Sequence, residues 1–262
     1  GTIRQVWLQN AGFIWVPFIL IVTAAAWFGM NDIASAKASF KEQSAIFKRK
    51  HNWLMCVLYT GTFGSFIGYA AALPLLIRTE FPAVDPARYA FLGPLIGALA
   101  RPVGGWLADN FGGARVTLWN FVVMTLAVMS VLVFIPDDKG GSFAGFLAMF
   151  LLLFVTTGVG NGSTFRMIPI IFMTEHERAA ASQGDAALAE ARRAARRESA
   201  AVLGFTSAIA AYGAFFIPKS FGTSVSLTGG AELALYLFTM FYLICIALTW
   251  WYYARPRAEV PC

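Results

Sequence analysis

Seven long runs of apolar residues, separated by polar or basic connections, dominate the chain. A membrane-spanning helix needs about 20 mostly apolar residues, and a helix satisfies its own backbone hydrogen bonds, as lipid requires. The pattern therefore predicts an all-α membrane protein with about seven transmembrane helices. The predicted spans are residues 11–30, 52–77, 89–108, 116–136, 142–168, 199–218 and 233–254.

The composition also indicates a membrane protein. Hydrophobic residues make up 58% of the 262 residues and charged residues only 13%, whereas a soluble domain usually has about 25% charged residues. The net charge of +6 does not indicate nucleic-acid binding, because the basic residues lie between the apolar runs, where membrane proteins carry them. We expect the lipid bilayer as a partner, and no nucleic acid.

Basic residues are concentrated in every second connection. By the positive-inside rule these connections, and with them the C-terminus, are predicted to be cytoplasmic. The cytoplasmic set consists of Lys37, Lys41, Lys48, Arg49, Lys50, Arg115, Arg178, Arg192, Arg193, Arg196, Arg197, Arg255 and Arg257. The opposite set is smaller and consists of Arg4, Arg78, Arg88, Lys139 and Lys219.

With an odd number of spans this orientation puts the N-terminus outside, so we expect the chain to be the later part of a longer protein. Residues 1–30 would then hold the last helix of a first bundle and residues 31–51 a cytoplasmic linker. Residues 52–254 would form a C-terminal six-helix bundle, and 255–262 a cytoplasmic tail. Residues 175–198 are rich in Ala, Arg and Glu. They are expected to form a short helix that either lies on the anionic leaflet or is simply solvated.

Arg101 is the strongest candidate for chemistry, because it lies inside an apolar run and no acidic residue lies deep in any predicted helix. Eight helical residues separate it from Asp109 near the predicted membrane surface, which places it about 12 Å deep. Insertion scales charge roughly 2.5–3.5 kcal/mol for an Arg at the middle of the bilayer. The planar guanidinium offers paired donors to an oxyanion, so the sequence predicts an anion site. The alternative is an Arg that only bonds carbonyl groups of neighbouring helices.

Other polar and aromatic residues accompany Arg101 at membrane depth. Asn161 lies in a glycine-rich helix and needs a hydrogen-bond partner, either another helix or a ligand. Tyr59 and Phe63 are four residues apart and so share a helix face. A Tyr at that depth must form a hydrogen bond, although spacing alone favours a helix contact over a ligand contact.

Glycines and a second Arg have more ordinary interpretations. Gly64 and Gly68 form a G-x-x-x-G pattern that predicts a close helix–helix contact. Arg166 is expected near Glu175 and the cytoplasmic surface, where an Arg can reach water at little cost.

An enzyme or cofactor protein is not expected. Cys56, Cys245 and Cys262 match neither a disulfide framework nor a metal-binding spacing. His51 and His176 lie in or beside cytoplasmic connections, which argues against haem in the membrane. We find no nucleophile motif and expect no cofactor and no metal.

Two resemblances to known families follow from short motifs. The segment Gly105-Trp-Leu-Ala-Asp109-Asn-Phe-Gly112-Gly-Ala-Arg115 resembles the cytoplasmic loop motif of the major facilitator superfamily. A closer resemblance, to the nitrate/nitrite porters of the NarK type, covers nearly the whole chain. It rests on Ala98-Leu-Ala-Arg101, Gly160-Asn-Gly-Ser-Thr-Phe165, Gly204-Phe-Thr-Ser-Ala-Ile209 and Phe215-Phe-Ile-Pro218. The stretch that begins at Gly204 resembles the second glycine-rich nitrate signature of this family, but it departs from that signature at Ala210, Tyr212 and Ala214.

The resemblance implies the later part of a twelve-helix fold that transports nitrate and nitrite by alternating access in the inner membrane of a bacterium. It implies a substrate site between two bundles, with the first bundle and a second Arg supplied by the part of the transporter missing here. The implied substrate-binding residues are Arg101, Tyr59, Phe63, Ser207, Gly204 and Asn161. Because no titratable carboxylate or His lies within the predicted spans, nitrate/nitrite exchange is preferred over proton symport. A non-transporting anion sensor and a structural scaffold are rival interpretations of the same residues.

Overall fold

The chain is described by a computed structural model over residues 9–31, 43–136 and 140–262. The described residues fall into two units on either side of residues 32–42, and each unit is considered by itself. Most of the predicted linker, residues 31–51, therefore lies outside the described residues.

The first unit is helical. In place of the single helix predicted over residues 11–30, it contains α1 (Gln9–Phe13) and α2 (Trp15–Gly29). The Ile14 amide donates to the Asn10 carbonyl at 3.2 Å, so helical hydrogen bonding continues across the junction. α2 has 15 residues, none of them buried. By itself it is shorter than the roughly 20 residues that cross a hydrocarbon core.

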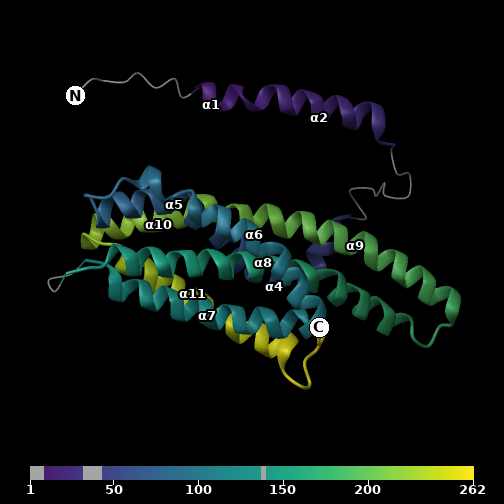
Figure 1. Ribbon diagram of the computed structural model, residues 1–262. Helices are drawn as coiled ribbons and strands as arrows, with labels where there is room; N and C mark the ends of the chain where they lie inside the picture. The colour runs from purple at the N-terminus through teal and green to yellow at the C-terminus, as the bar shows by residue number, and fades with distance from the viewer. Residues whose placement is uncertain (1–8, 32–42, 137–139) are drawn as a thin grey trace. The chain divides into compact units, whose positions relative to one another are not determined.

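The second unit consists of six long helical stretches that run roughly along one axis (Figure 1). Each is long and apolar enough to cross a membrane, which confirms the six spans predicted after residue 50. A short 3₁₀ turn, η2 (Ser44–Lys48), precedes them. The stretches are α4 (Lys50–Tyr59) with η3 (Thr60–Gly64) and α5 (Ser65–Glu80); η4 (Pro86–Arg88) with α6 (Leu92–Phe111); α7 (Gly113–Phe134); α8 (Phe143–Ala180); α9 (Asp185–Ala211) with α10 (Gly213–Thr228); and α11 (Glu232–Thr249) with η5 (Trp250–Ala254).

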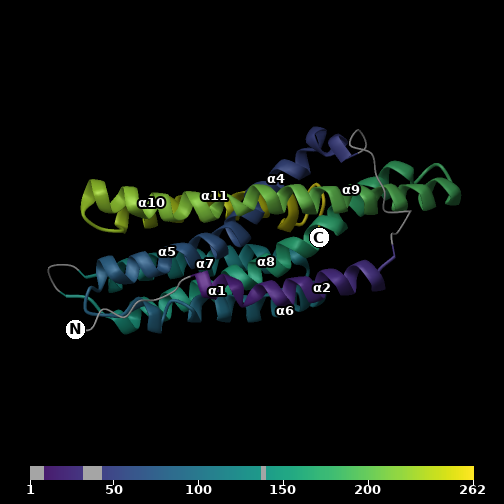
Figure 2. The ribbon, with the colours of Figure 1, turned by 90° about the horizontal axis from the view of Figure 1, so that it is seen from above.

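Two helices are much longer than predicted. α8 has 38 residues and α9 has 27, so residues 175–198 are not a separate short helix, and that prediction is wrong. They form the ends of α8 and α9, which project as a hairpin beyond the other helices of the bundle (Figures 1 and 2). Ala, Arg and Glu are strong helix formers, and they carry both helices past the apolar spans. Gly184, with a φ of 89°, begins α9 after the turn, a conformation that glycine adopts without strain.

α8 is the central helix of the bundle and packs against α6, α7 and α9. α10 packs against α5, and α11 against α7. The α5–α10 contact depends on glycine: a Cβ on Gly68 would lie 2.7 Å from the Gly213 carbonyl oxygen, and one on Gly213 would collide with the backbone of Gly64. The predicted G-x-x-x-G contact face is therefore confirmed.

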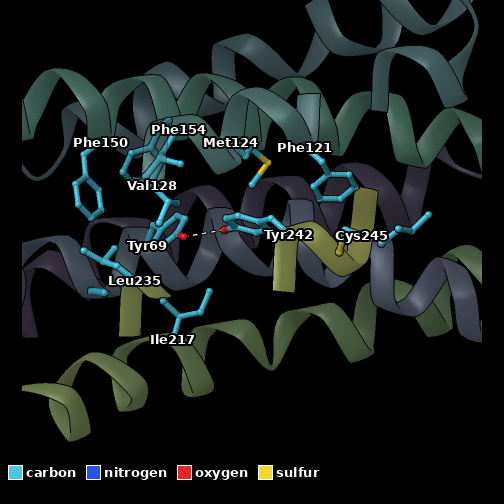
Figure 3. Packing of buried hydrophobic residues seen from close by; sticks show 14 of the residues in the cluster. Tyr69, Phe121, Met124, Val128, Phe150, Phe154, Ile217, Leu235, Tyr242 and Cys245 are labelled. Atoms are coloured by element: carbon cyan, nitrogen blue, oxygen red, sulfur yellow. Dashed lines mark hydrogen bonds between the residues drawn. The ribbon is translucent and has the colours of Figure 1, made fainter. Parts of the chain in front are cut away.

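The core of the bundle is aromatic. Phe150 and Tyr69 meet edge to face, with ring centroids 5.8 Å apart, and Figure 3 shows them among buried aliphatic side chains. The Tyr69 and Tyr242 hydroxyls lie 2.7 Å apart, and Tyr242 donates to Ser65 Oγ at 2.8 Å. Each buried phenol thus has a partner, which a hydroxyl away from water requires.

Candidate anion-binding site

A close contact between α6 and α8 positions Arg101. A Cβ on Gly158 would collide with the carbonyl oxygen of Gly97, and one on Gly162 would collide with the carbonyl oxygen of Arg101. The two backbones therefore touch at this level, as small residues permit in membrane helix pairs. As a result the Arg101 side chain can reach the neighbouring helix.

Asn161 on α8 is the residue that Arg101 binds. Arg101 Nη2 donates to Asn161 Oδ1 at 3.1 Å, and the Tyr59 hydroxyl donates to the same oxygen at 3.0 Å. Because a guanidinium has no acceptor, the amide oxygen must face Arg101 and the amide nitrogen must point elsewhere.

The amide nitrogen of Asn161 is left without a partner. Nδ2 is buried and has no hydrogen bond in the described part of the chain, and the whole residue is only 1% exposed. Leaving a buried donor unpaired costs about 1–3 kcal/mol. Such a donor beside a cation that pairs with no described carboxylate is suited to an anionic acceptor.

Aromatic rings flank the guanidinium. The Phe63 ring stacks on Tyr59, with centroids 5.2 Å apart and an interplanar angle of 27°. Arg101 Cζ lies 5.4 Å from the centroid of Phe63, within the range of a cation–π contact. Phe165, half-exposed on α8, has its centroid 6.3 Å from that of Tyr59. The charge is thus held between an amide oxygen and an aromatic face.

The first long stretch is not a regular helix where it meets this site. Residues Thr60–Gly64 form a π-helical turn, η3, directly after Tyr59. The Thr62 and Thr164 hydroxyls lie 3.1 Å apart and join this turn to α8. Such π-bulges are frequent at functional sites. The sequence interpretation treated residues 52–77 as one helix and missed this turn, although its Thr and Gly residues are weak helix formers.

α9 supplies a hydroxyl to the edge of the site. Ser207 Oγ donates to the Leu203 carbonyl at 2.7 Å and also lies within hydrogen-bonding reach of the Tyr59 hydroxyl. Gly204 lies one turn earlier on α9, and a Cβ there would have nothing within 4 Å. The structure therefore brings Arg101 and Ser207 to Tyr59, but Gly204 faces open space.

The loop motif lies at the junction of α6 and α7. Gly112 ends α6 with a φ of 89°, a backbone conformation that favours glycine. Gly105 lies in α6, and Arg115 lies in the first turn of α7. Asp109 accepts from Arg166 Nε at 2.6 Å.

Arg166 thus forms an ion pair with Asp109, a partner that the sequence did not predict. Glu175 instead lies 3.6 Å from His51 Nε2. No carboxylate of the described residues pairs with Arg101, so its charge is uncompensated within the bundle.

Comparisons with known proteins give nitrate/nitrite transporters among the relatives. The nitrate/nitrite transporter NarU of Salmonella typhimurium is 49% identical over 254 residues, covering 96% of this chain and 54% of the relative. The probable nitrate/nitrite antiporter NarK2 of Thermus thermophilus is 39% identical over 266 residues, covering the whole chain and 55% of the relative. The chain thus spans about half the length of these curated relatives. No family model matches the chain.

The fold has a counterpart among solved structures. A crystal structure of FucP, a major facilitator superfamily transporter in the outward conformation, aligns with a TM-score of 0.58 at 14% identity. The alignment covers 92% of this chain and 54% of FucP. Over nearly its whole length, this chain of apolar, membrane-spanning helices is thus similar to nitrate/nitrite transporters of the NarU and NarK type, of which it spans about half the length, and it shares the fold of a major facilitator superfamily transporter.

Proposed function

We propose that this chain is the C-terminal half of a nitrate/nitrite transporter and that Arg101, Asn161 and Tyr59 bind the anion. The observation that carries the proposal is the Arg101–Asn161 pair: a guanidinium without a described carboxylate partner, beside a buried amide donor without a partner. The names of the relatives supply the substrate class.

The chemistry of these side chains suits a small planar anion. The free N–H groups of Arg101 can donate to two oxygens of nitrate at once. Asn161 Nδ2 can donate to a third acceptor, and the Phe63 ring covers one face and excludes water. In a low-dielectric site the anion neutralises Arg101, which removes the cost of an unpaired, partly buried charge.

The remaining half of the transporter would complete the site. The relatives are nearly twice as long as this chain, and we propose that a second bundle closes over Arg101 and contributes a second Arg. Residues 1–30 would belong to that bundle and 31–51 to the linker, with the tail 255–262 cytoplasmic. Rocking of the two bundles would open the central site to each side in turn.

Exchange of nitrate for nitrite is the preferred mode. Within the described spans neither a carboxylate nor a His lies at the site, and Arg101 stays protonated and cannot carry a transported proton. The test is nitrate uptake into proteoliposomes with and without internal nitrite, at several external pH values. Uptake that needs internal nitrite supports exchange, whereas uptake driven by an inward proton gradient alone establishes symport.

Arg101→Lys tests the site itself. Lys keeps the charge but cannot donate two parallel hydrogen bonds, so nitrate exchange by the transporter should fall by at least tenfold, the equivalent of about 1.4 kcal/mol. The matched control is Arg88→Lys, on an exposed side chain whose partner, Asp85, lies in the same turn. Full activity of Arg101→Lys would favour a scaffold role and remove the proposed anion site.

A further inference from the structure

A second feature of the bundle lies outside the Arg101 site. It is an apolar groove of about 500 Å³ formed by α6, α7 and α8. Its lining residues are Leu107, Phe111, Arg115, Val116, Trp119, Asn120, Val123, Thr156 and Val159.

The groove follows the axis of α7. Four lining residues of this helix, from Val116 to Val123, recur at helical spacing on one face, so they form a continuous stripe about 10 Å long. Phe111 and Trp119 on its rim are 60% and 68% exposed. Three of the four, Val116, Trp119 and Val123, are apolar, so the stripe gives the groove an elongated apolar wall.

One end of the stripe carries a positive charge. Arg115 lies in the first turn of α7, is exposed, and forms no ion pair with any described carboxylate. The nearby carboxylate of Asp109 already accepts from Arg166, so it does not neutralise Arg115. The N-terminus of α7 lies at the same end, where the Ala114 amide donates to the Cys262 carbonyl oxygen at 2.9 Å.

We propose that this groove binds one phospholipid with an anionic headgroup. The phosphate would bind Arg115, and an acyl chain would lie along the groove past Trp119 and Val123. Basic residues at the membrane surface between helices attract acidic headgroups in this way, and the apolar groove explains why one lipid would be held in place rather than exchange freely. Trp119, an amphipathic ring on the rim, lies where it can contact both parts of the lipid.

The experiment uses Trp119 as the reporter. The transporter is reconstituted in phosphatidylcholine that contains a small fraction of phosphatidylglycerol brominated on its acyl chains, and tryptophan fluorescence is measured. The component that Trp119→Phe abolishes is the signal from the groove. We expect brominated phosphatidylglycerol to quench this component about fivefold more effectively than brominated phosphatidylcholine at the same fraction, because one basic residue near the surface is worth about that preference.

Two variants separate the contributions of charge and groove. Arg115→Gln should remove the preference for phosphatidylglycerol, whereas Arg88→Gln, on an Arg outside the groove, should retain it. Val123→Phe should reduce quenching by filling the groove while Arg115 stays in place. Circular dichroism and size-exclusion chromatography establish that each variant is folded.

Two outcomes would overturn the proposal. Equal quenching by both brominated lipids would make the groove an ordinary contact with bulk lipid. Absence of quenching at Trp119 by either lipid would mean that protein covers the groove. Both outcomes are independent of nitrate transport, so they leave the proposed function untouched.

Discussion

Replacing Asn161 by Asp is the most informative perturbation of the proposed site. The side chain keeps its shape, but the unpartnered Nδ2 donor becomes an oxygen and the group gains a negative charge. Arg101 Nη2 lies 3.1 Å from the amide oxygen that the carboxylate would replace. At this separation an ion pair is worth about 5.4 kcal/mol with an effective dielectric constant near 20.

Nitrate would have to compete with this internal ion pair. If only half of the attraction opposes binding, the loss is about 2.7 kcal/mol, or roughly a hundredfold in the dissociation constant. We therefore expect Asn161→Asp to weaken nitrate binding by at least that factor, measured by isothermal titration calorimetry on the purified transporter.

Two control variants show whether the added charge at position 161 causes the loss of nitrate affinity. Asn161→Leu removes the amide donor without adding charge and leaves Arg101 free for the anion, so it should weaken binding by only about tenfold. Asn110→Asp adds the same charge to an exposed side chain that donates to the Trp106 carbonyl, and it should leave binding nearly unchanged. Folded Asn161→Asp protein with an unaltered nitrate affinity would refute the argument that Arg101 and Asn161 hold the anion.

Three further predictions concern packing and pH. Gly162→Ala should destabilise the fold by about 1–3 kcal/mol and lower the melting temperature accordingly, because a Cβ there collides with a carbonyl oxygen of α6. Gly105→Ala is the control: a Cβ there has no atom within 4 Å, so the melting temperature should stay unchanged. Tyr69→Phe should cost about 1 kcal/mol of stability for one lost hydrogen bond and leave the nitrate dissociation constant unchanged, whereas a weakened affinity would show that the core and the site are coupled. The hydrogen bond from Lys50 lowers the pKa of Glu259, so this pair stabilises the fold above the ordinary Glu pKa and the contribution is lost as pH falls through the lowered value. In thermal melts from pH 6 to pH 3, Glu259→Gln should be less stable than the unchanged protein only near pH 6, by no more than about 0.5 kcal/mol for so exposed a pair. A stability difference that stays constant across this pH range would contradict a stabilising Lys50–Glu259 ion pair.

The six spans of the bundle could be predicted from sequence because the length of an apolar run is a local property. Lipid requires each run to satisfy its own backbone, so a run of sufficient length is a helix whatever surrounds it. The same rule failed for the ends of α8 and α9. Polar helical residues beyond the membrane carry no apolar signal, and only the structure shows that both helices continue as a paired hairpin.

The candidate site, too, could be predicted from the sequence only in part. The position of Arg101 inside an apolar run, without an acidic residue deep in any predicted helix, could be predicted along the chain, because it depends only on composition and spacing. The partner of Arg101 could not: Asn161 lies 60 positions away, and only the glycine contact between α6 and α8 brings the two side chains to 3.1 Å. The orientation of the Asn161 amide depends on that contact as well, and so does its unpaired donor. Sequence alone thus identified Arg101 as the charged residue inside an apolar run. Tertiary packing decided that Arg101 binds Asn161, because a hydrogen bond depends on the distance between atoms of different helices.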